Sequence, residues 1–194
     1  MQAAPEWSDL SQDVRTRASA AKSAVLDDRD VVLIGPPGCG KTMVARRLQR
    51  NLKKIDAMGS DMAFVYRLHG TGMPCPTALS QPFRAPHHTV SNPAMIGGGA
   101  FMRPGECSLS HGGILFLDEV TEFNRTVLDT VSRVHRDKIV DFGERYRWIK
   151  TLPADFVLVV AYSPCPCGFY GTDRNLSRLD RLELNNPITV DLSK

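Results

Sequence analysis

The residues of this chain that could do chemistry begin with a glycine-rich segment. Residues 35–42 fit the phosphate-binding loop pattern G-x-x-x-x-G-K-[ST] at every required position, between an apolar β-branched run and a helix-prone stretch. A strand, a glycine-rich turn and a helix N-terminus together present backbone N–H groups and a partial positive charge to phosphate oxygens. The pattern therefore predicts a nucleotide site, whose contacts are expected from Gly35, Pro36, Pro37, Gly38, Cys39, Gly40, Lys41, Thr42 and Met43.

A second segment supplies the groups that hydrolysis would need. Lys41 is expected to reach the β- and γ-phosphates of ATP, and Thr42 to offer its hydroxyl to Mg²⁺. The apolar run 114–117 ends in Asp118 and Glu119, which places two carboxylates at the carboxyl edge of a buried strand, where α/β sheets bind ligands. Asp118 is expected to hold Mg²⁺ through water, and Glu119 to polarise the attacking water. A strand that merely ends in two solvated acids would explain this segment alone, but not its combination with the loop.

The elements that must position these groups follow from hydrophobic periodicity. Strands alternating with helices predict a three-layer αβα fold with a mostly parallel, five-stranded sheet. A long connection, 69–112, is rich in Gly, Pro, Ser and His and has weak periodicity, which is typical of a functional segment. Residues 138–152 predict a hairpin that turns at 142–144. The expected strands are 31–34, 63–68, 114–117, 156–161 and 188–190, and the expected helices are 12–26, 43–54, 125–135 and 176–182.

Composition limits the class of protein. The 194 residues suffice for one domain, and no apolar run approaches the roughly 20 residues that cross a bilayer. Five cysteines, an odd number, and the lack of a secretory signal favour a reducing cytoplasm. The net charge of +3 conceals two basic clusters, which could contact nucleic acid phosphates or could be solvated faces; charge alone favours solvated faces. They are Lys41, Arg46, Arg47, Arg50, Lys53 and Lys54, and Arg133, Arg136, Lys138, Arg145, Arg147 and Lys150.

Beyond the loop, several motifs resemble one family. RAPHHT at 84–89, IGGG at 96–99, PGE at 104–106 and SLSHGG at 108–113 look like the magnesium-chelatase-type AAA+ ATPases. Within that family the ComM branch of magnesium chelatase-like proteins is the most similar, since SPCPCG at 163–168 resembles its Asn-Pro-Cys-Pro-Cys-Gly. The resemblance runs from about residue 14 to 192, nearly the whole chain.

The resemblance implies an AAA+ core that assembles into homo-oligomeric rings, typically hexamers, with ATP sites shared between neighbours. Residues 87–112 look like the insertion in the second helix of this clade, and 138–152 like the hairpin before sensor 1, which in related motors faces the pore and can contact DNA. The ComM branch implies helicase or branch-migration activity on single-stranded or branched DNA. The chelatase branch implies remodelling of a protein partner, and neither implies a membrane.

The same resemblance assigns two further site residues. Ser163 stands at sensor 1, where the family usually has Asn; a serine hydroxyl is shorter and has one donor where Asn has two, so slow turnover is expected. Arg181 is expected to act in trans on the γ-phosphate of a neighbouring subunit. Arg178 is its alternative, and pairing of either arginine with a carboxylate such as Asp180 or Glu183 would be merely structural.

Metal binding outside the nucleotide site is not favoured. Cys165 and Cys167 cannot complete a four-ligand zinc site alone, so a turn stiffened by prolines is the preferred interpretation. His87 and His88 are expected to point in opposite directions and to serve loop hydrogen bonding.

The domain prediction is a single AAA+ core over residues 1–194, with 1–29 as a helical lead-in and with neither the family's lid nor an N-terminal accessory domain. Two functions stay open. One is an ATP-driven motor on DNA; the other is a nucleotide-dependent regulatory or assembly subunit that hydrolyses ATP slowly and acts on a protein partner.

Overall fold

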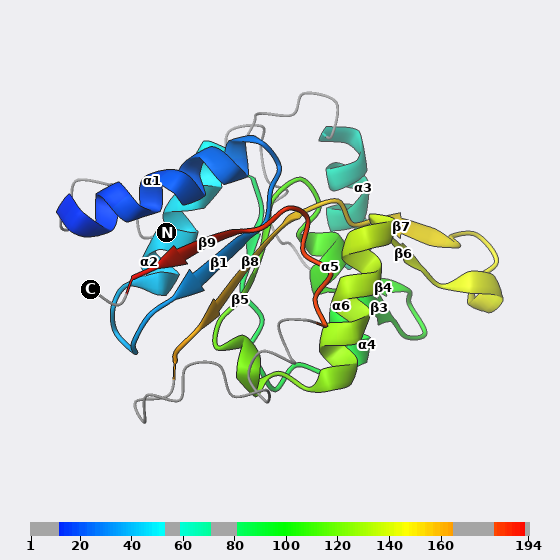
Figure 1. Cartoon of the computed structure of the whole chain (residues 1–194). Coiled ribbons are helices and arrows are strands. Elements are labelled where there is room, and N and C mark those ends of the chain that lie inside the picture. Colours follow the sequence, from blue (N-terminus) through cyan, green and yellow to red (C-terminus); the bar gives the residue numbers. More distant parts are fainter. Residues whose placement is uncertain (1–11, 53–58, 71–80, 165–180, 193–194) are drawn as a thin grey trace.

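A five-stranded parallel sheet organises the computed structural model, which describes residues 12–52, 59–70, 81–164 and 181–192 (Figure 1). Neighbouring strands are in parallel register throughout, which confirms the predicted α/β class. In spatial order the strands are β2 (Phe83–Arg84), β5 (Ile114–Leu117), β8 (Val157–Tyr162), β1 (Val31–Ile34) and β9 (Ile188–Asp191).

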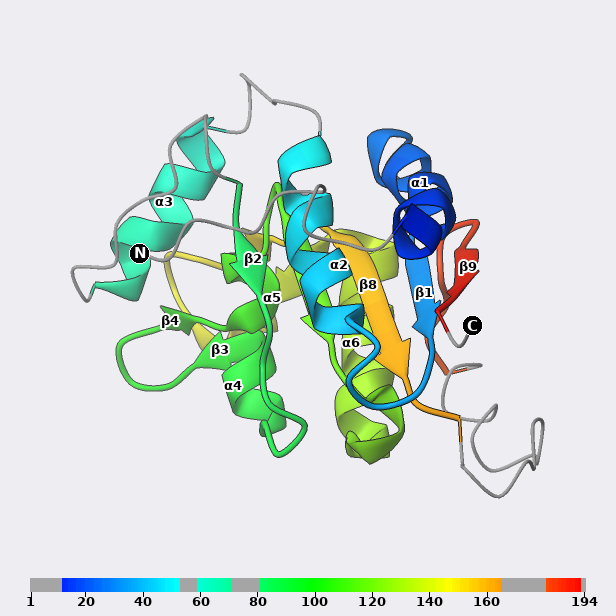
Figure 2. The ribbon, with the colours of Figure 1, turned by 90° about the vertical axis from the view of Figure 1, so that its left-hand side faces the viewer.

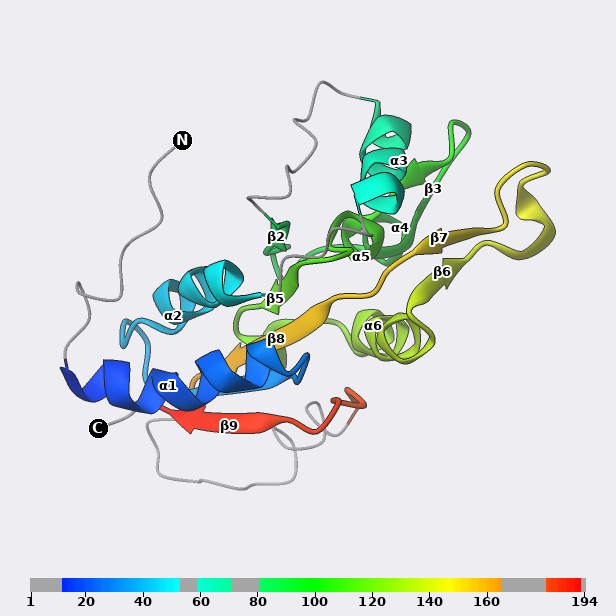
Figure 3. The ribbon, with the colours of Figure 1, turned by 90° about the horizontal axis from the view of Figure 1, so that it is seen from above.

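Helices cover both faces of this sheet, because its strands are apolar on both sides. α1 (Gln12–Leu26) and α2 (Lys41–Leu48) lie on one face, and α6 (Arg125–Asp137) on the other (Figure 3). Successive residues of β5 alternate between two core clusters: Ile114 and Phe116 pack toward α1 and α2, while Leu115 and Leu117 pack toward α6. The three layers that the sequence predicts are therefore present.

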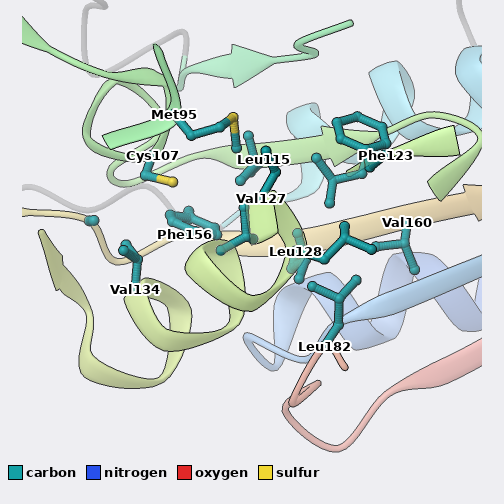
Figure 4. Packing of buried hydrophobic residues seen from close by; sticks show 14 of the residues in the cluster. Met95, Cys107, Leu115, Phe123, Val127, Leu128, Val134, Phe156, Val160 and Leu182 are labelled. Carbon is teal, nitrogen blue, oxygen red and sulfur yellow. The ribbon is translucent and has the colours of Figure 1, made fainter. Parts of the chain in front are cut away.

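The larger core cluster lies beneath α6 (Figure 4). Val127, Leu128, Val131 and Val134 recur at helical spacing and are buried against the sheet. The helix begins at its N-cap Asn124, whose side-chain oxygen accepts a hydrogen bond from the Thr126 N–H. Local sequence and packing thus agree on where this helix lies.

Short elements occupy the long connection between α2 and β5 (Figure 2), the turn between β5 and α6, and the segment between α6 and β8 (Figure 1). No helix among the described residues is long and apolar enough to cross a membrane. These elements are α3 (Gly59–His69), α4 (Asn92–Ile96), β3 (Gly97–Gly98), β4 (Arg103–Pro104), α5 (Glu106–Leu109), β6 (Ile139–Asp141) and β7 (Thr151–Pro153), with 3-10 turns η2 (Gln49–Asn51), η4 (Val120–Glu122) and η5 (Gly143–Arg145).

The predicted strand at 63–68 is wrong, because this segment belongs to helix α3. Met62, Val65 and Tyr66 are buried together at helical spacing, whereas Phe64 between them is 45% exposed. A short apolar run does not distinguish a strand from a helix, and here the helical face decides. The remaining strand of the sheet is β2, inside the connection for which the sequence predicts no regular element.

The predicted hairpin exists, but its turn is longer than expected. β6 pairs antiparallel with β7, and Asp141 opposite Thr151 closes the ladder, so the connecting loop is 142–150 rather than a tight turn at 142–144. Other predicted boundaries shift as well: α2 spans 41–48 rather than 43–54 and is followed by a 3-10 turn at 49–51, and β8 spans 157–162 rather than 156–161. The helix expected at 176–182 lies mostly outside the described residues.

A buried carboxylate ties the layers together at the edge of the sheet opposite the predicted nucleotide site. Asp30, fully buried, accepts hydrogen bonds from the backbone N–H groups of Leu158 (2.9 Å) and Asn185 (2.5 Å). His135 of α6 contacts the same carboxylate at 2.8 Å through Nε2. Because one carboxylate contacts His135 of α6 and the backbone of both Leu158 and Asn185, Asp30 fixes α6 and the segment before β9 relative to β8.

We expect the Arg84–Glu106 ion pair to hold the inserted segment on the sheet. Arg84 donates through Nε and an Nη to the two carboxylate oxygens of Glu106, at 2.7 Å each, in a partly buried position. Arg84→Ala leaves Glu106 without this partner and should cost about 1–3 kcal/mol, with Arg84→Lys costing less because the charge remains. Thermal denaturation should show a melting temperature lower by about 2–4 °C per kcal/mol. Arg103→Ala, at the exposed residue of β4, is the matched control, and an equal loss there would contradict the role of the pair.

Candidate active site

The predicted phosphate-binding loop adopts a turn that only glycine allows at two positions. Gly38 and Gly40 have φ values of 81° and 95°, in the left-handed region that L side chains rarely adopt. At Gly35 a Cβ would lie 2.6 Å from the Sγ of Cys39, so the start of the loop is closely packed as well. Sequence and backbone therefore agree on a preformed loop, whose outer residues are the exposed Pro36, Pro37, Gly38, Thr42 and Met43 and the half-buried Cys39 and Gly40.

Lys41, at the start of α2, is the most engaged side chain of the site. It is 5% exposed, and its Nζ donates to the carbonyl oxygens of Gly35 (2.8 Å) and Pro36 (3.1 Å) and to the hydroxyl of Ser163 (2.8 Å). The same ammonium lies 3.4 Å from Oε1 of Glu119. All three N–H donors thus have acceptors, and the charge is centred beneath the loop.

Ser163 and Glu119 form the next step of this chain of hydrogen bonds. The Ser163 hydroxyl accepts from Lys41 and donates to Glu119 Oε1 at 2.6 Å, while the Ser163 backbone N–H donates to Oε2 at 3.0 Å. Glu119 itself has left-handed backbone angles, φ 50° and ψ 58°, which for a non-glycine residue costs roughly 1–3 kcal/mol and is found most often at functional sites. The Glu119 carboxylate is therefore oriented by its unusual backbone conformation and by the two hydrogen bonds from Ser163.

Thr42 and Asp118 meet beside this chain. The Thr42 hydroxyl donates to Asp118 Oδ2 at 2.8 Å. A hydroxyl and a carboxylate are oxygen ligands of the kind that Mg²⁺ prefers, and Mg²⁺ in nucleotide sites takes few protein ligands because it keeps waters and phosphate oxygens. The residues present therefore fit a magnesium ion shared with a bound phosphate.

Sheet topology explains how residues far apart in sequence reach one point. β5, β8 and β1 are adjacent parallel strands, so their carboxyl ends lie at one edge. Asp118 and Glu119 follow β5, Ser163 follows β8, and the loop with Lys41 follows β1 (Figure 3). The structure thus brings together every predicted site residue except Arg181, whereas their catalytic roles stay predictions.

Arg181 lies away from this cluster, against the helix α6. Its guanidinium donates to Asp129 of α6 at 2.8 and 3.0 Å, and the side chain is 38% exposed. This is the carboxylate pairing that the merely structural alternative expected, with Asp129 as the partner. This position on the surface does not bring Arg181 to the site of its own chain, and its action on a neighbouring subunit stays a prediction. Arg178, Asp180, Cys165 and Cys167 lie outside the described residues.

The two adjacent histidines do not point in opposite directions. The rings of His87 and His88 lie 3.9 Å apart between centroids, tilted by 37°. Nδ1 of His87 also lies 2.9 Å from the hydroxyl of Thr89, which is the expected loop hydrogen bonding. A local turn brings the rings to the same side, which an extended segment would not do.

Two aromatic residues stand exposed at hairpin tips: Trp148, whose sequence setting suggests either base stacking or hairpin packing, and Phe101, which sequence reasoning missed. Phe101, in the β3–β4 hairpin, is 85% exposed, and Trp148, in the β6–β7 loop, is 87% exposed. The Arg147 guanidinium lies 5.4 Å from the centre of the Trp148 ring. The sequence could have indicated an exposed Phe101, because this aromatic residue closely follows three glycines in a segment with no periodic buried face.

Comparison with known proteins gives one family and several relatives. The model of "Magnesium chelatase, subunit ChlI" matches residues 9–186. The chain is 41% identical over 147 residues to YifB of Salmonella typhimurium, which covers 75% of this chain and 29% of that protein. It is 39% identical over 153 residues to the competence protein ComM of Haemophilus influenzae, covering 78% and 30%. The chain therefore spans under a third of the length of the curated relatives it matches.

Solved structures share the fold at low sequence identity. A model of the complex between subunits BchI and BchD of magnesium chelatase superposes with a TM-score of 0.63 at 20% identity, over 92% of this chain and 58% of that chain. NtrX from Brucella abortus in complex with ATP gives 0.59 at 19% identity, over 94% and 37%. At these identities the similarities concern the fold alone.

Proposed function

The chain belongs to the magnesium chelatase ChlI family of AAA+ ATPases, and from this premise we propose that it hydrolyses Mg·ATP in a ring of like subunits and acts on DNA. The observation that carries the hydrolysis is the chain of contacts from Lys41 through Ser163 to Glu119, beside the Thr42–Asp118 pair. A lysine under a phosphate loop and an oriented carboxylate are the two groups that phosphoryl transfer to water needs.

Each residue of the chain has a separate task in this proposal. Lys41 exchanges the carbonyls of the loop for phosphate oxygens and stabilises the charge that builds up during transfer. Glu119 accepts a proton from the attacking water, and Ser163 hydrogen-bonds the γ-phosphate or the water in place of the family's Asn. Thr42 and Asp118 would hold Mg²⁺, which when bound neutralises phosphate charge.

Arg181 is assigned to the neighbouring subunit's site. Its surface position, held by Asp129, leaves the guanidinium at the boundary of the chain, where a second copy could receive it. A finger supplied in trans would make turnover rise with protein concentration, because isolated subunits would lack it.

The β6–β7 hairpin is the proposed DNA contact. Exposed Trp148 can stack on a base, and Arg145 and Arg147 can neutralise phosphates, whereas Lys150 already pairs with Glu144 at 2.7 Å. The relation to ComM supports DNA as the substrate, and the hairpin supplies a surface suited to it.

We expect single-stranded DNA to accelerate ATP hydrolysis by this chain. Arg145→Gln/Arg147→Gln should reduce that stimulation and lower the slope of log affinity against log salt by about 1.4, roughly 0.7 for each single-strand phosphate that is no longer neutralised. The measurement is steady-state hydrolysis with and without an oligonucleotide over a range of protein and salt concentrations. Arg15→Gln/Lys22→Gln on exposed α1 removes the same charge elsewhere and is the control. Equal losses in both variants would show a nonspecific charge effect and count against the hairpin.

A second function is favoured by one observation, the serine at sensor 1. Ser163 offers one donor, and that donor is committed to Glu119, so hydrolysis would be slow and ATP would act as a gate. The complex of BchI with BchD shows a chain of this fold with a protein partner. Tight ATP binding with negligible turnover, unaffected by DNA or protein concentration, would favour this regulatory or assembly subunit over the motor.

A further inference from the structure

Two hairpins from separate parts of the sequence meet on the side of the molecule away from α1. The first, residues 97–104, is formed by β3 and β4, and the second, residues 139–153, by β6 and β7 (Figures 1 and 3). Their contact is the hydroxyl of Tyr146, which donates to the carbonyl oxygen of Gly99 at 2.7 Å. Each partner of this hydrogen bond is followed, two residues later in the sequence, by an exposed aromatic residue: Gly99 by Phe101 and Tyr146 by Trp148.

Tyr146 is held firmly on its own side of the contact. Its ring packs edge-on against Phe142, with 5.5 Å between centroids and an interplanar angle of 83°. Both rings also pack against the core cluster beneath α6. A tyrosine fixed by its ring presents its hydroxyl at a defined point, so the hydrogen bond positions the other hairpin and not the tyrosine.

The glycines of the first hairpin make this approach possible. Gly97, Gly98 and Gly99 have φ values of 95°, 119° and 80°, which only glycine adopts readily in succession. A Cβ at Gly98 would lie 3.1 Å from the Tyr146 hydroxyl oxygen. Gly98 is therefore the glycine whose missing side chain leaves room for Tyr146, whereas a Cβ at Gly97 would meet the backbone of its own hairpin.

We infer that Tyr146 is a positioning residue that joins the 97–104 and 139–153 hairpins, so that Phe101 and Trp148 form one two-part surface for single-stranded nucleic acid. This inference rests on the proposed function. Exposed aromatic faces bind bases that are already unstacked, which selects a single strand over a duplex. Exposed Arg103, Arg145 and Arg147 lie on the same two hairpins. Of the two acids there, Glu144 pairs with Lys150, and Asp141 accepts a hydrogen bond from the Gly143 N–H at 2.7 Å.

The fold links this surface to the site of hydrolysis. β7 leads into β8, which Ser163 follows, and the first hairpin leads through α5 into β5, which Asp118 and Glu119 follow. Each hairpin is therefore attached to the near end of a strand whose far end carries site residues.

Trp148 itself is the probe for the test. The chain has two tryptophans, so Trp7→Phe leaves Trp148 as the reporter of oligothymidylate binding through fluorescence quenching. On that background, Tyr146→Phe should weaken binding about fivefold, the effect of one hydrogen bond. Phe101→Ala should weaken binding in the presence of Tyr146 and add little in its absence, because the unjoined hairpin no longer presents Phe101 beside Trp148.

Two further variants make the result decisive. Tyr66→Phe removes a hydroxyl that also donates to a backbone carbonyl, that of Leu109 at 3.0 Å, and should leave binding unchanged. Gly98→Ala breaks the contact from the opposite hairpin and should reproduce the effect of Tyr146→Phe. If one of these variants folds poorly, the other still tests the contact. Independent, additive losses from Phe101→Ala and Tyr146→Phe, or no loss from Tyr146→Phe and Gly98→Ala, would overturn the joining role and leave DNA binding intact. An absence of quenching in the parent would overturn DNA binding itself.

Discussion

Replacing Lys41 by alanine should abolish ATP hydrolysis and weaken ATP binding together. Its ammonium is the positive group that the structure places beneath the loop, and it contacts Ser163 and lies 3.4 Å from Glu119. Removing a preorganised group that stabilises transition-state charge costs about 3–4 kcal/mol, or roughly 100- to 1000-fold in rate. Because the proposed function also gives this ammonium the ground-state phosphates to hold, the affinity for ATP should fall as well.

The measurement is steady-state hydrolysis combined with titration of a fluorescent ATP analogue. Lys22→Ala, an exposed lysine on α1, is the matched control and should behave as the parent. The removed side chain is buried, so thermal denaturation must show that the variant is folded before the rates are compared. Parent-like turnover in folded Lys41→Ala would reject the phosphate-loop assignment.

The elements that the sequence predicts best are those whose burial is set by their own pattern. β5 is expected at 114–117 and lies there, because four consecutive apolar residues suit a strand buried on both faces. α6 is equally clear, since its apolar residues recur at helical spacing between a cap and a polar end. In both cases local sequence and tertiary packing favour the same structure.

The failures come from elements that packing alone determines. α3 is a helix because Met62, Val65 and Tyr66 share one buried face, which the run 63–68 does not reveal. β2 has two residues and no periodicity of its own, and it becomes a strand only by pairing with β5. The local sequence therefore predicts neither the helix α3 nor the strand β2.

The same division holds at the site. The loop and the Asp118–Glu119 pair are predictable because each is a local pattern. The Ser163–Glu119 hydrogen bonds and the Tyr146–Gly99 contact join residues 44 and 47 positions apart, and no spacing announces them. The structure therefore reveals what the sequence does not mainly where two strands or two hairpins come into contact.

Replacing Glu119 by glutamine should separate binding from hydrolysis, which the Lys41 variant cannot do. Glutamine keeps the shape of the side chain and an oxygen that can accept from the Ser163 N–H, so ATP affinity should stay near that of the parent. It cannot accept the proton of the attacking water, and loss of a general base costs about 100- to 10,000-fold in rate. Glu122→Gln, an exposed acid three residues further on, is the control and should hydrolyse normally.

The Glu119→Gln variant also tests whether sites are shared. It keeps Arg181, so when mixed with Arg181→Ala it can supply the finger to a neighbour whose Glu119 is intact. A ring with sites between subunits predicts that the mixture hydrolyses ATP faster than either variant alone, whereas independent subunits give only the average of the two rates. Parent-like turnover in Glu119→Gln would reject the catalytic assignment. A mixture whose rate equals the average of the two variants would keep the catalytic assignment of Glu119 and reject the role of Arg181 in a neighbouring site. The surface pair with Asp129 would then be the whole role of Arg181.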